Sequence, residues 1–428
     1  MSSPSFFIAL LLSCAALEAA EFKFDFTSGK PHPGYTQVTP GTAYDGQRHF
    51  GFLNNTALAT ADQPPSASVF GVDVDEGNYD VTIRFGDPSS ATSTTIKAES
   101  RRLMIEKVDT APGKYETRTF TVNVRKPAIS TGGVTLLNSR ENGPPPTPDW
   151  DERLTLEFNG QHPGVVSLEI TPAKDATTIF VAGDSTVTDQ KNEPWAGWGQ
   201  MLPRFFQPGV AISNQAESGL ALYSFERQKR LEKILSMMKK GDYLFIQFGH
   251  NDQKDKTAGA GPFTSYSANL KKFIAAARGK GGIPVLVTPM ERRRWNGDEP
   301  VPTLADYAKA VIQVGGEEKV PVIDLNAMSL KFYRALGPEK STQAFVFYPA
   351  NTFPGQDKEL KDNTHHNTYG GYELARCIVE GIKAEVPELA KRLTKDAGTF
   401  DPAKPDAPEK VAIPVSPLTG PTEKPAGS

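Results

Sequence analysis

Two different patterns of apolar positions divide the chain near residue 173. In the first part, apolar residues alternate with polar ones over the short stretches 79–85, 120–124, 154–158 and 166–170. Alternation with a period of two is typical of strands that bury one face. Clusters of Gly, Pro, Asn and Ser separate these stretches. The pattern predicts an all-β sandwich over residues 21–172.

From residue 175 onward, short apolar runs alternate with stretches of helical periodicity. Residues 224–239 and 266–278 carry apolar side chains three and four positions apart, as in a helix with one buried face. This alternation is typical of a parallel sheet covered by helices on both faces, and it predicts an α/β domain over residues 175–393. The apolar runs predict strands at 178–182, 211–214, 243–248, 284–288 and 320–325.

The two ends of the chain differ in composition from the parts between them. Residues 1–20 are typical of a secretory signal peptide, because an apolar run at 6–12 precedes several alanines. An alternative is a lipoprotein signal, in which Cys14 would carry a lipid anchor. We therefore expect a secreted or periplasmic protein, or one anchored to the cell envelope. Residues 394–428 are polar and rich in proline, and we expect them to be disordered.

Charge, hydropathy and the positions of cysteine and histidine argue against a nucleic-acid partner, a membrane span and a metal site. The chain has 47 Lys and Arg residues against 50 Asp and Glu residues, which argues against a broad basic face for nucleic acid. No segment after the first 20 residues is long and apolar enough to span a membrane. The second of the two cysteines, Cys377, lies in an apolar helical stretch, where we expect a buried and inert thiol. The histidines and cysteines form no cluster with zinc-ligand spacing, so no metal is expected.

Polar residues with catalytic potential follow the predicted strands of the α/β domain. Ser185 comes directly after the first strand, Gly219 follows the second, and Asn251 follows the third. Because the carboxyl ends of parallel strands meet at one edge of a sheet, these residues are expected to lie close together. Taken one at a time, the same segments also fit helix caps and Asx turns.

A second candidate segment lies before the last predicted helix. Asp362 precedes His365 by three residues, so its carboxylate can reach Nδ1 and leave Nε2 free to act as a base. We expect this segment to be a loop that leads into a helix near Tyr369. His366 is a competing base, although we expect it to face solvent or substrate instead. A surface histidine without a catalytic role is the alternative for either residue.

The motifs occur in an order that resembles a known family. Gly183-Asp184-Ser185-Thr186, then Gly219, then the Gly-His-Asn-Asp of 249–252 and the Asp-x-x-His of 362–365 resemble the SGNH (GDSL) hydrolases. Within them the chain is similar to rhamnogalacturonan acetylesterases of carbohydrate esterase family 12, over roughly residues 176–390. It departs where Leu220 and Ala221 follow Gly219, since comparable members often have Arg-Ser there.

The resemblance implies a three-layer α/β/α fold and a Ser-His-Asp mechanism. Ser185 would be the nucleophile, His365 the base and Asp362 its partner. The backbone N–H groups of Ser185 and Gly219 and the side-chain amide of Asn251 would form the oxyanion hole. No cofactor or metal is implied. The N-terminal sandwich resembles galactose-binding-type domains and is a candidate carbohydrate-binding module.

The implied activity is the removal of O-acetyl groups from pectic rhamnogalacturonan, an acetylated polysaccharide. Aromatic faces stack on sugar rings and arginines pair with uronate carboxylates, which makes some nearby residues candidate substrate contacts. Acetylated xylan, another glycan or a small ester is an alternative substrate, and a non-catalytic carbohydrate-binding protein is an alternative function. The candidate contacts are Trp195, Trp198, Arg292 and Arg293.

Overall fold

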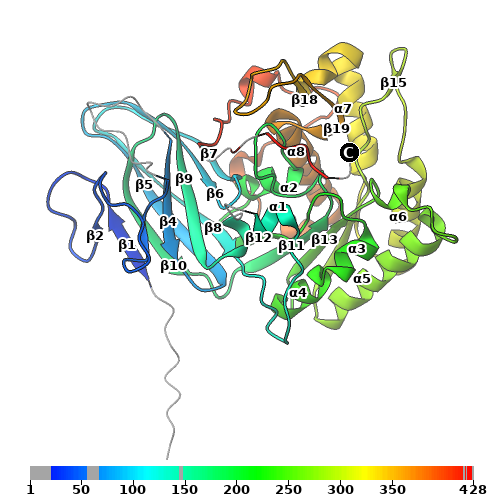
Figure 1. Cartoon of the computed structure of the whole chain (residues 1–428), viewed down its shortest axis with the longest axis horizontal. Helices are drawn as coiled ribbons and strands as arrows, with labels where there is room; N and C mark the ends of the chain where they lie inside the picture. Colours follow the sequence, from blue (N-terminus) through cyan, green and yellow to red (C-terminus); the bar gives the residue numbers. More distant parts are fainter. Residues whose placement is uncertain (1–20, 55–66, 144–147, 418–419, 421, 427–428) are drawn as a thin grey trace, which may run out of the picture.

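The computed structural model describes residues 21–54, 67–143, 148–417, 420 and 422–426. The N-terminal strands are β1 (Phe22–Asp25), β2 (Thr36–Gln37), β3 (Phe50–Phe52), β4 (Ser68–Asp73), β5 (Gly77–Gly86), β6 (Thr92–Ala98), β7 (Arg102–Thr110), β8 (Tyr115–Val124), β9 (Arg153–His162) and β10 (Val165–Pro172). They form two five-stranded sheets, ordered β2-β1-β10-β5-β8 and β3-β4-β9-β6-β7 (Figure 1). Every pairing in these sheets is antiparallel except that of β1 with β2.

Alternate side chains of these strands fill the space between the two sheets. On β5, Val81, Ile83 and Phe85 are fully buried, whereas the polar residues between them are partly exposed. The ring of Phe70 on β4 meets that of Phe24 on β1 edge to face, with centroids 5.2 Å apart, and so joins one sheet to the other. The two sheets therefore share one apolar core.

The second part of the chain is built on a five-stranded parallel sheet. Its strands run in the order β12-β11-β13-β14-β17, and every neighbouring pair is parallel. The strands are β11 (Thr177–Gly183), β12 (Val210–Asn214), β13 (Tyr243–Gln247), β14 (Ile283–Val287) and β17 (Val322–Ile323).

Among the described residues, one short α-helix lies in the first part of the chain, between β8 and β9, and the others lie in the second part. The helices are α1 (Ser139–Asn142), α2 (Trp198–Met201), α3 (Leu222–Arg227), α4 (Arg230–Met237), α5 (Ser267–Gly279), α6 (Ala305–Glu318), α7 (Leu325–Lys340), α8 (Thr368–Glu385) and α9 (Pro387–Ala390).

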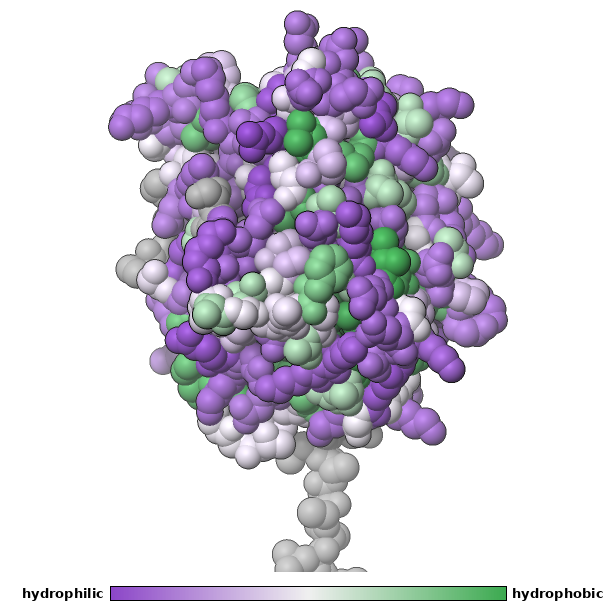
Figure 2. All heavy atoms as spheres, turned by 90° about the vertical axis from the view of Figure 1, so that its right-hand side faces the viewer, coloured by the Kyte–Doolittle hydropathy of each residue, from purple (hydrophilic) through white to green (hydrophobic). Residues whose placement is uncertain are grey.

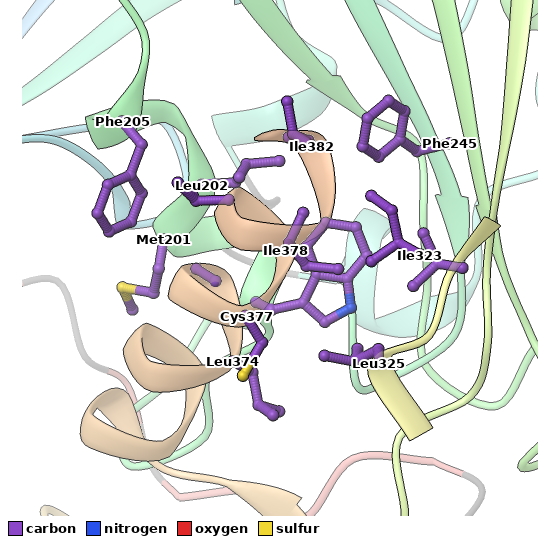
Figure 3. Packing of buried hydrophobic residues seen from close by; sticks show 14 of the residues in the cluster. Met201, Leu202, Phe205, Phe245, Ile323, Leu325, Leu374, Cys377, Ile378 and Ile382 are labelled. Carbon is purple, nitrogen blue, oxygen red and sulfur yellow. The ribbon is translucent and has the colours of Figure 1, made fainter. Parts of the chain in front are cut away.

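The side chains of β11 alternate between two separate cores. Ile179 and Val181 belong to a core that includes residues of α7 and α8, while Phe180 belongs to one that includes residues of α5 and α6. Figure 3 shows Cys377 on α8 within the first of these cores, where its thiol is fully buried. Helices thus cover both faces of the sheet, and the predicted α/β class with a preceding β region is confirmed.

Two predicted elements differ from the structure. The helix expected over 224–239 is divided into α3 and α4, because Lys229 takes a left-handed backbone conformation with φ of 60°. The strand expected over 320–325 is limited to β17, since Asp324 caps the next helix by accepting a hydrogen bond from the N–H of Ala327. Two antiparallel pairs complete the fold: β15 (Trp295–Asn296) with β16 (Glu299–Pro300), and β18 (Phe345–Tyr348) with β19 (Leu360–His366).

The proline-rich segment after residue 393 differs from the expectation of disorder, up to Pro417. The Nζ of Lys97 donates to the carbonyl of Pro414, and the Oγ of Ser416 donates to Glu157, both at 2.5 Å. Lys97 and Glu157 are buried on the sandwich, so they need polar partners, and this segment supplies them. Composition alone contains no information about such distant partners.

The sandwich contacts the α/β domain through a buried arginine, Arg102, at the start of β7. Its Nε donates to Asp189 at 2.7 Å, its Nη2 donates to Asp149 at 2.9 Å, and its Nη1 donates to the carbonyl of Asn123 at 2.9 Å. Asp189 belongs to the loop that follows β11, so one guanidinium links both parts of the chain. Charge-assisted hydrogen bonds of this kind are strong when each partner is satisfied.

Replacement of Arg102 by Met is expected to destabilise the protein by about 3–5 kcal/mol, because two buried carboxylates would lose their partner. The exposed Arg118, which pairs with Glu116 on β8, is the matched control, and Arg118→Ala should cost less than about 1 kcal/mol. Urea unfolding followed by tryptophan fluorescence measures both. Equal losses for the two variants would contradict this role of Arg102.

Candidate active site

Three polar side chains form a hydrogen-bonded chain at the carboxyl edge of the parallel sheet. Ser185 lies in the turn after β11, and its Oγ is 2.7 Å from Nε2 of His365. The Nδ1 of His365 is 2.8 Å from Oδ2 of Asp362. When Nδ1 carries a proton for the carboxylate, Nε2 can accept the proton of the serine hydroxyl. The structure thus brings Ser185 next to the Asp362–His365 pair, although His365 comes 180 residues later in the sequence.

Asp362 and His365 lie on β19 rather than in the loop expected from the sequence. This strand pairs with β18, which holds its backbone in place. Oδ1 of Asp362 accepts the N–H groups of Thr364 and His365 at 2.8 and 3.1 Å. Burial by itself raises the pKa of Asp362, but hydrogen bonding and charge from His365 outweigh it and hold the pKa below its usual range. The carboxylate is therefore ionised and oriented toward the imidazole.

The two further oxyanion candidates lie on neighbouring loops. Gly219 has a φ of 81°, in the region that favours glycine, and it follows β12. Asn251 follows β13, and its Nδ2 donates to the carbonyl of Leu220 at 3.1 Å. This contact holds the Asn251 amide against the loop of Gly219. That the two donate to an oxyanion beside Ser185 stays a prediction.

Comparison with known proteins identifies the family. A family model described as GDSL-like Lipase/Acylhydrolase family matches residues 181–352. Rhamnogalacturonan acetylesterase RhgT of Bacillus subtilis is 40% identical over 213 residues, which are 49% of this chain and 91% of that protein. The chain belongs to the GDSL-like lipase/acylhydrolase family. The expected family, and with it an enzyme that hydrolyses carboxylic esters, is confirmed.

Two other proteins are similar to this acylhydrolase. The probable rhamnogalacturonan acetylesterase YesY of Bacillus subtilis is 34% identical over 226 residues, 52% of this chain and 99% of that protein. The crystal structure of the Bacillus subtilis protein YxiM is 25% identical and covers 85% of this chain and 98% of that chain, with a TM-score of 0.45.

Contacts that the sequence did not indicate support Ser185 of the acylhydrolase. The Nε2 of Gln190 donates to the carbonyl of Ser185 at 2.7 Å. The carbonyl of Gln190 in turn accepts a hydrogen bond at 2.9 Å from Arg101 of the sandwich. On the other side, Oδ1 of Asp184 accepts hydrogen bonds from the N–H and the hydroxyl of Thr186. The turn that carries Ser185 is thereby fixed at both ends.

A buried acid–imidazole pair lies next to this turn. The Nδ1 of His250 is 3.4 Å from Oδ2 of Asp184, and both side chains are buried. Burial lowers the pKa of His250, against the opposing charge of Asp184. Burial also raises the pKa of Asp184, but the charge and hydrogen bond of His250 and the bonds from Thr186 bring it below its usual value. Both residues belong to motifs that the sequence analysis used only as markers for Ser185 and Asn251.

His366 does not face solvent or substrate, contrary to expectation. It is 1% exposed, its Nε2 lies 2.9 Å from the hydroxyl of Tyr333, and its ring packs against that of Phe345. Burial lowers its pKa to about 3, so the imidazole stays neutral. The Nε2 of His366 thus contacts Tyr333, whereas that of His365 lies 2.7 Å from Oγ of Ser185, so His365 is the histidine that faces Ser185.

The two candidate tryptophans are interior residues. Trp198 is fully buried, and its Nε1 donates to Gln247 at 2.7 Å. Trp195 is 2% exposed, and its Nε1 donates to Oδ2 of Asp362 at 3.4 Å. Neither ring has a free face on which a sugar could stack, so both predicted substrate contacts are wrong. Trp195 instead supports the carboxylate of Asp362.

The two candidate arginines do lie at an open hollow of about 760 Å³. Its lining includes Asn363, which directly follows the catalytic carboxylate and whose Oδ1 accepts a hydrogen bond from Nη1 of Arg293 at 2.8 Å. Arg292 donates to the carbonyl of His250 at 3.2 Å. The complete lining is Gln253, Lys254, Arg292, Arg293, Arg294, Val301, Pro302, Thr303 and Asn363.

Among the described residues, no group of three or more His, Cys, Asp or Glu side chains could hold a metal ion. Within the same part of the chain, no helix is long and apolar enough to cross a membrane. The predicted signal segment and Cys14 lie outside the described residues.

Stability should depend on pH through Asp252. Burial and the charge of Asp184 raise the pKa of this carboxyl to about 7. A carboxyl with a higher pKa in the folded chain than in the unfolded chain costs stability as pH rises between the two values, from about 4 to about 7. Asp252→Asn removes this cost. The variant should gain roughly 2–4 kcal/mol relative to the wild type over that interval and no more above it.

Urea unfolding at pH 5, 6, 7 and 8 measures this difference. Asp306→Asn is the matched control, because Asp306 is exposed. Parallel pH profiles for the wild type and Asp252→Asn would show that Asp252 ionises normally in the folded protein.

Proposed function

We propose that this protein is a carbohydrate esterase that removes O-acetyl groups from pectic rhamnogalacturonan through a Ser-His-Asp acyl-enzyme mechanism. The observation that carries the proposal is the chain of contacts from Ser185 to His365 to Asp362, at 2.7 and 2.8 Å. Family membership supports ester hydrolysis, and the names of RhgT and YesY support an acetylated pectic substrate.

In the proposed mechanism, Oγ of Ser185 attacks the acetyl carbonyl carbon while Nε2 of His365 takes the hydroxyl proton. The backbone N–H groups of Ser185 and Gly219 and the amide of Asn251 stabilise the oxyanion. The sugar oxygen then leaves with the proton held by His365 and leaves an acetyl group on Ser185. The oxygen of a water molecule then attacks the acetyl carbon while Nε2 of His365 takes a proton from it. The bond from that carbon to Oγ of Ser185 breaks, Oγ takes the proton back from His365, and acetate departs. The ionised Asp362 stabilises the imidazolium in both halves of the reaction.

The charge of the hollow next to the catalytic residues favours an anionic polymer over neutral xylan. Arg292, Arg293 and Arg294 line it, and among the described residues none of the three has a carboxylate within ion-pair distance. By contrast, the buried Arg102 and Arg230 both pair with carboxylates. Arg292 and Arg293 donate hydrogen bonds to neutral groups of the chain, so their positive charge is not neutralised and is suited to the carboxylates of uronate sugars. We propose Arg292 and Arg293 as substrate contacts on this basis.

The exposed surface also suits a polysaccharide. Figure 2 shows that the face of the α/β domain turned to the viewer is mainly hydrophilic, with only scattered apolar residues. An enzyme that works at a lipid surface needs a larger contiguous apolar patch.

The proposal includes export and a division of the chain. Residues 1–20 would be a signal peptide, with lipid anchoring at Cys14 as the alternative, so that the enzyme meets its polymer outside the cytoplasm. Residues 21–172 would form the sandwich domain and residues 175–393 the esterase domain. The buried contacts of Arg101 and Arg102 with the serine loop support a structural role for the sandwich beside any binding of sugar.

Acetate release from acetylated rhamnogalacturonan tests the proposed mechanism. Ser185→Ala should abolish release, and Asn251→Ala should lower kcat by about 10²–10³ because one oxyanion donor is lost. Tyr223→Ala, a change at an exposed position, is the control and should leave the rate unchanged. Release that survives Ser185→Ala would show that another residue is the nucleophile, and wild-type protein without release would favour a non-catalytic carbohydrate-binding protein.

Substrate charge tests the role of the arginines. Arg292→Gln and Arg293→Gln should each raise KM for acetylated rhamnogalacturonan by about 2- to 5-fold and leave KM for acetylated xylan unchanged. Added salt should reduce the difference between variant and wild type. The exposed Arg334, which pairs with Glu299, is the control position. Equal changes in KM for both polymers would mean that the arginines do not distinguish a charged from a neutral substrate, even if Ser185 proves to be the nucleophile.

A further inference from the structure

The loop that carries Asn251 packs against the segment that follows β14. Because β13 and β14 are parallel neighbours, the loops after them leave the same edge of the sheet. Gly249, at the start of the first loop, has a φ of 141°, and a methyl group built on its α-carbon would come within 3.0 Å of Pro289. Residues 249–254 therefore lie directly beside residues 289–293.

Arg292 connects this segment to the loop on both sides of Asn251. Its Nη2 donates to the carbonyl of His250 at 3.2 Å, and its Nη1 donates to Oε1 of Gln253 at 2.9 Å. His250 directly precedes Asn251, and Gln253 follows it by two residues. A guanidinium is planar and its N–H groups point in fixed directions, so it holds two acceptors at a set separation. A shift of the 249–254 loop would break at least one of these bonds.

The backbone from which Arg292 extends is itself fixed. Glu291, the residue before it, is fully buried. One oxygen of the Glu291 carboxylate accepts the N–H and the hydroxyl of Thr303 at 2.6 and 2.8 Å. The other accepts the N–H of Leu304 at 3.1 Å and the side-chain amide of Asn326 at 3.0 Å. Arg292 can therefore hold the neighbouring loop in place instead of moving with it.

The direction of the Asn251 amide depends on where this loop lies. Its Nδ2 donates to the carbonyl of Leu220 at 3.1 Å, and its Oδ1 accepts a hydrogen bond from Nζ of Lys254 at 3.3 Å. The proposed mechanism requires a second N–H of the same Nδ2 to point at the oxyanion. Such a donor acts only at hydrogen-bond distance, so a displacement of about 1 Å would weaken it strongly.

We propose that Arg292 is a positioning residue, which holds the oxyanion donor Asn251 in place through the carbonyl of His250 and the side chain of Gln253. The inference rests on the proposed function, because it concerns the same oxyanion. Arg292 also lines the hollow assigned above to the uronate sugars. Its charge then contributes to KM for the polymer, and its two hydrogen bonds to the loop contribute to kcat for any acetyl ester.

A double-mutant cycle with 4-nitrophenyl acetate tests whether Arg292 acts through Asn251. This small ester carries no carboxylate, so recognition of substrate charge plays no part. Arg292→Gln alone should lower kcat by about 5- to 10-fold, because the oxyanion donor is displaced. In the Asn251→Ala variant the same substitution should lower kcat by less than about twofold, since the donor is already absent. Equal losses in both backgrounds would overturn the proposal.

Arg292→Lys separates the charge of this residue from its geometry. Lysine keeps the positive charge, but a single ammonium group does not reproduce the fork that holds two acceptors. KM for acetylated rhamnogalacturonan should therefore stay within about twofold of the wild type, while kcat stays about fivefold lower for both the polymer and the small ester. A variant with wild-type kcat would show that positioning by the guanidinium is not needed.

Arg278, at the end of α5, offers the matched control. It donates to the carbonyl and to the carboxylate of Glu318, and it lies at the opposite edge of the sheet, before β14 begins. Arg278→Gln should leave kcat unchanged, and tryptophan emission verifies that each variant is folded.

The outcomes separate this inference from the proposed mechanism. If Asn251→Ala leaves kcat unchanged, the oxyanion assignment fails and the positioning role fails with it. If Asn251→Ala lowers kcat and Arg292→Gln adds its full loss, the mechanism stands and only the positioning role is wrong.

Discussion

Two adjacent arginines at the end of a sandwich hairpin fix the loop that carries Ser185. Arg102 is buried between Asp149 of the sandwich and Asp189 of the serine loop, and Arg101 donates to the carbonyls of Gln190 and Trp195. A buried guanidinium requires that every one of these acceptors stay in place. Because Gln190 in turn donates to the carbonyl of Ser185, the requirement extends to Ser185. The sandwich therefore supports the loop that carries Ser185.

The other half of the site is rigid for a different reason. Asp362 lies opposite Val346 of β18, but the pairing is irregular between Asp362 and His366, so local contacts orient His365. Its N–H donates to Oδ1 of Asp362 at 3.1 Å, and its Nδ1 lies 2.8 Å from Oδ2 of the same carboxylate. Trp195 connects the two halves: its indole donates to Asp362, and its carbonyl accepts from Arg101. The serine loop is thus held by the sandwich at one side and by the Asp-His strand at the other. Chemistry at the sheet edge requires such a fixed distance between Oγ and Nε2.

Features that follow from the local pattern of residues, such as the order of the motifs, could be predicted from the sequence. Features that depend on partners far away in the sequence, such as burial and long-range hydrogen bonds, could not. Ser185 directly follows a predicted strand, Asp362 and His365 precede the last predicted helix, and the structure brings the three together. Trp198 was misjudged because an aromatic residue after a strand has the same local signal whether it is buried or exposed. The order in the segment up to Pro417 could not be foreseen, since its partners are more than 200 residues away. Arg101 and Arg102 carried no signal for the same reason.

The position of Asp149 in the chain has a consequence for how the enzyme forms. Asp149 precedes the serine loop, so it is available to Arg102 before Asp189 has been synthesised. In a sandwich that folds first, Asp149 already pairs with the guanidinium of Arg102. The Nε–H of Arg102 is then in place to donate to Asp189. When the serine loop packs against the sandwich, Asp189 meets an arginine that is already in position. The order of synthesis, N-terminal sandwich before esterase, is thus the order in which the buried charges can be neutralised one after another.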